Sequence, residues 1–147
     1  MINSIYDIHY DVSLDSFLTK NLIDTFKDLE NKSLDLDLLG NIMSSNPSLN
    51  VAAKGGNGWS SDLWVKVKNE LYTFFCEKSE KYASLEKELS AKTTDASSVI
   101  IPIISVFLAK EFNILSGVIL PFIILFFKIS LKITKESFCA YWKERLV

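Results

Sequence analysis

The sequence predicts an all-α protein that carries a strongly apolar helical hairpin toward its C-terminal end. Two observations lead to this fold class. Glycine and proline are scarce among the 147 residues, at five and three, and three of the five glycines lie between residues 55 and 58. The long stretches that remain carry apolar side chains at the three-and-four spacing of amphipathic helices. Because 48% of the residues are apolar, the chain has ample material for a core.

The first 54 residues form an acidic segment in which we expect amphipathic helices. Residues 1–12 alternate loosely and fit either a short strand or a docked arm. Residues 14–29 have apolar side chains at helical spacing, which predicts a helix of about four turns. Ser13 or Asp15 is suited to capping the N-terminal end of this helix.

Residues 33–40 fit a short helix that Ser33 caps and Gly40 stops, although their alternation also fits a strand. The helical neighbours favour the helix. Lys54-Gly55-Gly56-Asn57-Gly58 follows, and it lacks the spacing of a phosphate-binding loop. We therefore interpret residues 55–58 as a linker between an acidic segment, residues 1–54, and a more hydrophobic part, residues 59–147.

The second part opens with one long helix, which we expect over about residues 61–90. Ser60 or Ser61 is suited to capping it, and Asp62 falls in the first turn, where the helix dipole favours an acid. Glu77 and Lys81 are four residues apart, in the orientation that supports a helix.

Two uncharged stretches then predict the apolar hairpin, over about residues 97–144. Residues 97–109 and 112–127 carry no charge, and the pair Lys110–Glu111 interrupts them. We expect the chain to turn between Lys110 and Asn113. A continuing second helix would place Lys128, Lys132 and Lys135 in one stripe, which suits either anionic lipid headgroups or an exposed face.

A helix that is apolar nearly all round is either a buried core helix or a membrane span. A span needs about 17–25 residues, and the run 112–127 is just too short unless the chain beyond it is included. Two interpretations stay open: a hairpin inserted in or docked on a membrane, or a helical protein that buries the hairpin in its own core or in an oligomer. Tyr141 and Trp142 fit an interfacial belt as well as ordinary packing. In either case residues 97–134 are the expected contact with lipid or a protein partner, and we expect an oligomer.

No catalytic constellation is visible in the sequence. His9 is the one histidine, and no local signature pairs it with Cys76 or Cys139. We expect both cysteines to be reduced and buried as small hydrophobes. Asp35 and Asp37 have no calcium-loop pattern around them and are interpreted as a solvated acidic face. We expect no enzyme, no cofactor, no metal and no small-molecule substrate, and the net charge of −2 does not favour nucleic acid.

The distribution of charged residues along the sequence predicts where in the cell the protein lies. Met1-Ile2-Asn3-Ser4 leads into acidic mixed sequence instead of a basic start and an apolar run, so we expect a cytoplasmic N-terminal half. Basic residues after the hydrophobic block favour a cytoplasmic C-terminal end. We therefore expect the cytoplasmic face of the inner membrane, or the cytoplasm within a complex.

Residues 60–142 also resemble a known group of proteins. The resemblance rests on Leu63-Trp64-Val65, Glu70-Leu71, Phe75-Cys76, Lys81-Tyr82, the apolar hairpin, Lys135 and Phe138-Cys139-Ala140. This arrangement is similar to small, largely uncharacterised bacterial helical proteins with a C-terminal hydrophobic hairpin, some of which are encoded beside anti-phage defence genes. The resemblance implies a bacterial accessory or effector protein and supplies no catalytic residues. Together with the hairpin it predicts a non-enzymatic protein that inserts in or docks on the membrane; the alternative is a soluble interaction subunit of a homo- or hetero-oligomer.

Overall fold

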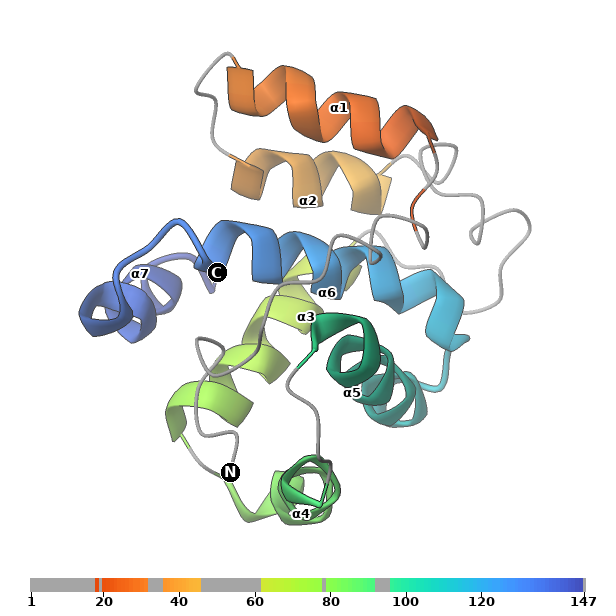
Figure 1. The fold of residues 1–147 in the computed structure, drawn as a ribbon, viewed down its shortest axis with the longest axis vertical. Helices are drawn as coiled ribbons and strands as arrows, with labels where there is room; N and C mark the ends of the chain where they lie inside the picture. Colours follow the sequence, from red (N-terminus) through yellow and green to blue (C-terminus); the bar gives the residue numbers. More distant parts are fainter. Residues whose placement is uncertain are drawn as a thin grey trace.

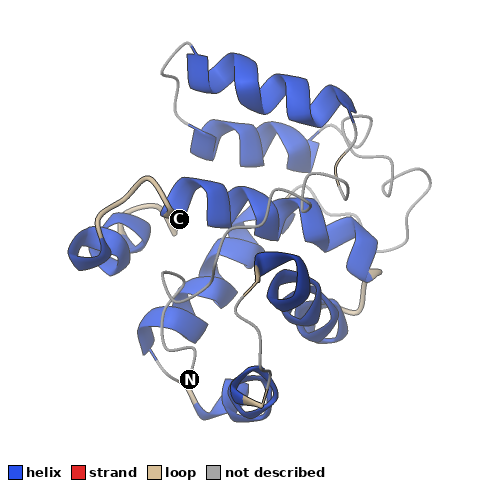
Figure 2. Ribbon diagram, in the orientation of Figure 1, coloured by secondary structure: helices blue, strands red, loops and turns tan. Residues whose placement is uncertain are grey.

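Every regular element in the described part of the chain is helical, so the predicted all-α class is confirmed (Figure 2). The computed structural model describes residues 18, 20–31, 36–45, 62–77, 79–91 and 96–146. The elements are α1 (Lys20–Asn31), α2 (Leu36–Ser45), α3 (Leu63–Tyr72), the π-helix η5 (Thr73–Glu77), the 3₁₀ turn η6 (Glu80–Tyr82), α4 (Ala83–Ser90), α5 (Ser97–Phe112), α6 (Ser116–Ser130), the 3₁₀ turn η7 (Lys135–Ser137) and α7 (Phe138–Lys143).

Helix α6 lies in the middle of the molecule, and the other helices are arranged around it (Figure 1). It packs against α5, α3 and α2. Helix α1 lies beyond α2, and α7 packs on α3 near one end of α6 (Figure 1). Of the elements predicted in the acidic segment, α1 overlaps the expected helix over residues 20–29 and continues to Asn31. The expected caps Ser13, Asp15 and Ser33 and the linker 55–58 lie outside the described residues.

The predicted hairpin is present as α5 and α6. Helix α5 ends at Phe112 and α6 begins at Ser116, so the turn begins at Asn113, the last residue of the expected range, while Lys110 and Glu111 are still helical. Asn113 ends α5 in the left-handed conformation, with φ of 55°, which asparagine tolerates better than most residues. The Ser105 hydroxyl donates a hydrogen bond of 2.8 Å to the Ser116 carbonyl and ties the two helices together near the turn.

The chain itself encloses the most apolar helix of the hairpin. All six side chains from Phe122 to Phe127 are at most 1% exposed, and six consecutive residues point in every direction around a helix. In this structure the monomer therefore covers most of α6; Leu120 is partly buried, and the first turn at Ser116 and Gly117 is exposed. Within the described residues, no helix combines the length and the apolar character that crossing a membrane requires.

The expected long helix is divided in two. Helix α3 passes into the π-helix η5, and Ser79 then adopts an extended conformation with ψ of 143°. The Ser79 hydroxyl accepts a hydrogen bond from the Lys81 backbone N–H, so it caps the new turn that leads into α4. The expected pairing of Glu77 with Lys81 is wrong, because this break removes the helical spacing between them.

The second helix of the hairpin ends earlier than the sequence predicts. Helix α6 stops at Ser130, so Lys128 lies in α6, Lys132 in the turn after it and Lys135 in η7, instead of forming one stripe. The turn after Ser130 brings α7 back onto the core, where the Trp142 indole N–H donates to the Ser130 hydroxyl at 3.0 Å. Trp142 is fully buried, so its role is core packing and not an interfacial belt.

Gly40 does not stop a helix, contrary to the expectation. Helix α2 continues through it to Ser45, and the Trp64 indole of α3 packs directly on its backbone. A Cβ atom at position 40 would lie 2.2 Å from that ring. The neighbouring Ser44 hydroxyl accepts a hydrogen bond of 2.9 Å from the Trp64 backbone N–H in the first turn of α3. A residue of α2 thus satisfies a free donor at the start of α3.

We predict that Gly40→Ala lowers the free energy of unfolding by about 1–3 kcal/mol, because the added methyl group has to displace a buried indole. Urea denaturation measures this value. The matched control is Gly117→Ala, at an exposed position in the first turn of α6, where alanine should be neutral or stabilise by up to about 1 kcal/mol. Equal stability of the two variants would contradict the close packing of α2 on Trp64.

Candidate functional site

Several residues that the sequence singles out lie outside the described part of the chain: His9, Asp35 and residues 54–58. The structure therefore does not test what the sequence indicated for them: no phosphate-binding loop at residues 54–58, no pairing of His9 with a cysteine, and no calcium loop at Asp35. Among the described residues, no group of three histidine, cysteine, aspartate or glutamate side chains is placed to hold a metal ion.

Asp37 has a structural role that the sequence did not predict. Its carboxylate accepts a hydrogen bond of 2.8 Å from the Trp64 indole N–H and one of 3.0 Å from the Lys68 ammonium. Lys68 is 2% exposed, so a buried cation has a carboxylate partner. The interpretation of Asp37 as part of a solvated acidic face is therefore wrong, and the residue joins α2 to α3.

The two cysteines form a disulfide, whereas we expected reduced thiols. Cys76 of η5 and Cys139 of α7 have Cα atoms 5.9 Å apart and are 63 residues apart in the sequence. Cys139 is exposed, so the expectation that both are buried hydrophobes is also wrong. Structural disulfides persist in oxidising compartments and are rare in the cytosol. This bond is therefore an argument against the cytoplasmic location, which stays a prediction.

A second polar cluster joins α3, η6 and α5. The Lys81 ammonium pairs with Glu70 at 2.7 Å and with Glu111 at 3.3 Å, and the Tyr82 hydroxyl donates to the same Glu70 carboxylate. The hydrogen bond to Glu70 raises the pKa of Lys81, and burial raises the pKa of Tyr82. Both groups hold their protons more firmly than usual, which is opposite to what a general base needs. The cluster therefore links α3, η6 and α5 and stabilises their packing.

Helix α5 differs from α6 in having one buried face and one open face. Its buried residues recur at intervals of three and four, and they are Ile100, Ile101, Ile104, Leu108 and Ala109 among apolar side chains. On the opposite side, Val99 is 40% exposed and Val106 is 48% exposed. The outer face of α5 thus remains open to solvent, as do Leu115 at the hairpin turn, which is 61% exposed, and Leu131 after α6, which is 38% exposed.

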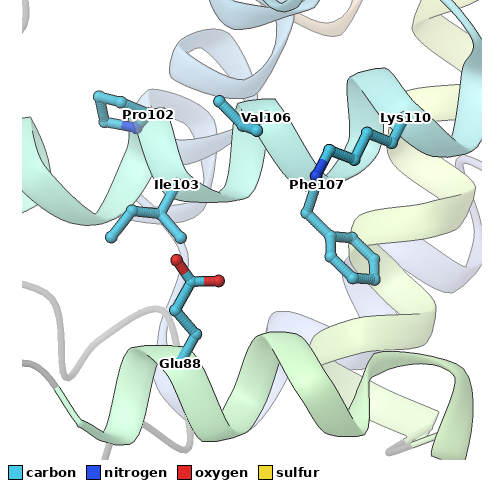
Figure 3. Close-up of a pocket in the computed structure, with 6 residues that line it drawn as sticks. All are labelled: Glu88, Pro102, Ile103, Val106, Phe107 and Lys110. Atoms are coloured by element: carbon cyan, nitrogen blue, oxygen red, sulfur yellow. The ribbon is translucent and has the colours of Figure 1, made fainter.

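A hollow of about 320 Å³ lies beside this face, between α4 and α5 (Figure 3). We call it the α4–α5 groove, and it is lined by Glu88, Pro102, Ile103, Val106, Phe107 and Lys110. Glu88 reaches up from α4 toward Ile103, and the Lys110 side chain lies back along α5 toward Phe107 (Figure 3). Apolar lining with a few charged groups is typical of a binding site.

The sequence predicted that residues 97–134 hold the contact surface but did not identify which side of the hairpin is open. Both faces of α5 are apolar, so periodicity gives no sign of which one the core takes. Glu88 lies on α4, which the sequence predicts as part of one long helix over residues 61–90. Its position beside Ile103 depends on the break in that helix at Ser79. The groove therefore required the structure.

No protein family, curated protein or solved structure matches this chain. The resemblance to defence-associated bacterial proteins stays a prediction.

We predict that breaking the disulfide with Cys76→Ser lowers the free energy of unfolding by about 4 kcal/mol, because the bond restricts a loop of 63 residues in the unfolded chain. Denaturation without reductant measures the loss. With a dithiol reductant present, the wild type and the variant should be equally stable. Wild-type stability that does not respond to reductant, or an intact mass with two free thiols in protein from an oxidising compartment, would contradict the prediction.

Proposed function

We propose that this chain is a small non-enzymatic helical protein that acts by binding a protein partner through the α4–α5 groove and the adjoining face of α5. The observation that carries the proposal is the difference between the two helices of the hairpin. The chain buries α6 on all sides, while α5 presents Val99 and Val106 to solvent beside a preformed hollow. This corresponds to the interaction subunit that the sequence offered as its alternative.

The spacing of the side chains along the outer face of α5 supports a helical partner. Val99, Ile103, Val106 and Lys110 follow one another at intervals of four, three and four residues, so they form one row along α5. Such a row beside a groove is the arrangement that receives the apolar face of another helix. Apolar side chains of the partner would fill the hollow above Phe107 and exclude water from it.

The charge in the groove favours protein over lipid. Glu88 lines the hollow, and a bilayer covering this face would have to desolvate its carboxylate without a compensating donor. A protein partner supplies a basic side chain at that position at no such cost. Membrane docking through the hairpin, the other function that the sequence predicts, therefore becomes the second outcome of the test.

We predict that a photoreactive phenylalanine analogue at Val106 crosslinks in living cells to a discrete protein partner. The same analogue at Leu38, which is 58% exposed on α2, is the matched control and should give little product. Adding Lys110→Glu to the Val106 probe should reduce the yield severalfold, because the charge in the groove is then wrong for the partner.

Flotation with vesicles of phosphatidylethanolamine and phosphatidylglycerol tests the membrane alternative. We expect the wild type to stay off the vesicles. A Val106 yield no higher than that at Leu38, or vesicle binding that Val106→Glu abolishes, would sink the proposal.

A further inference from the structure

The α4–α5 groove carries two opposite charges at two separate positions. Glu88 lies beneath Ile103, and Lys110 lies seven residues further along α5, which corresponds to about 10 Å of helix. Within the described residues neither side chain has an ion-pair partner. The apolar residues Val106 and Phe107 lie between the two charges, and Pro102 lies on the far side of Ile103 (Figure 3).

This pattern is self-complementary. In a two-fold symmetric contact, each residue i meets residue j of the other copy, and residue j meets residue i. An axis through the groove near Val106 turns one end of it onto the other. A second copy then brings its Lys110 to Glu88 and its own Glu88 to Lys110, which forms two ion pairs at once.

Resting on the proposed function, we propose that the partner in the α4–α5 groove is a second copy of this chain. The α5 helices of the two copies run antiparallel, so Val106 packs against Val106 of the other copy at the axis, and Ile103 of each copy lies near Lys110 of the other. Helix α4 flanks the contact on each side, so the interface is a four-helix arrangement centred on Val106.

Charge complementarity favours a copy over an unrelated helix. The groove has one acid and one base, so its formal charge is zero and two copies meet without net repulsion. An unrelated partner needs a base and an acid in the right order and at the right separation. A copy supplies both automatically. Val106, which is 48% exposed, provides apolar area at the centre that such an interface buries.

Reversing the charges at Glu88 and Lys110 gives a pattern of dimer affinities that only the two-fold contact predicts. In a dimer of Glu88→Lys, both pairs become lysine facing lysine, and in a dimer of Lys110→Glu both become glutamate facing glutamate. A mixture of the two variants restores both attractive pairs within a heterodimer. The double variant also restores both pairs, with the charges exchanged.

Sedimentation velocity over a concentration series up to the high micromolar range is the test. We expect the wild type to dimerise and each single variant to weaken the dimer at least about tenfold, since two attractions become two repulsions. The mixture and the double variant should recover most of the loss. Glu136→Lys and Lys143→Glu make the same charge changes at exposed positions of η7 and α7, and they should dimerise like the wild type.

A wild type that stays monomeric throughout, or a mixture that dimerises no better than its components, overturns the inference. The outcome remains separable from that of the proposed function. A Val106 crosslink whose product has the mass of two chains supports both. A crosslink to a different protein overturns only the second copy, whereas loss of the site-specific crosslink overturns the proposed function itself.

Discussion

The fold depends on one requirement: a helix that is apolar in every direction needs cover in every direction. Eleven of the fifteen residues of α6 are buried, and α2, α3 and α5 together supply most of that cover. Phe126 shows how the remaining side is closed, because it stacks on Trp142 of α7 with ring centroids 4.3 Å apart. A monomer of 147 residues therefore has enough other helices to shelter one such element.

Trp64 connects the helices that form this cover. Its ring lies on Gly40 of α2 and 6.3 Å from Phe122 of α6, and it meets Trp142 of α7 edge-on at 6.1 Å. Its indole N–H is bound by Asp37. The disulfide then ties η5, which continues α3, to α7. Because these contacts hold α2, α3 and α7 around α6, α5 is the partner in the hairpin with a free face.

Much of the fold is predictable from local sequence. The scarcity of glycine and the helical period give the all-α class, and the interruption by Lys110–Glu111, which lies in the last turn of α5, gives the position of the hairpin turn to within a few residues. These features are encoded in neighbouring residues. The division of the long helix was not predictable, because residues 61–90 keep an apolar period across the break and the decisive hydrogen bond is a single cap from Ser79.

The site was less accessible to sequence reasoning because its parts depend on distant residues. The glycine at position 40 has the appearance of a helix stop until Trp64 is placed on it. The pairing of Cys76 with Cys139 spans 63 residues, and the groove combines one residue of α4 with five of α5. The sequence correctly predicted an unusual amount of apolar surface in the hairpin. It did not show that the monomer covers one helix of that hairpin and leaves the other partly open.

Hydrogen–deuterium exchange of the monomer in detergent-free buffer tests the central claim most directly. If the chain encloses α6 by itself, the amides of Val118–Ser130 should be among the slowest to exchange, and their protection should not change on dilution or on addition of lipid vesicles. Rapid exchange across α6 in the monomer, with protection that appears only when vesicles or further copies are added, would contradict the account.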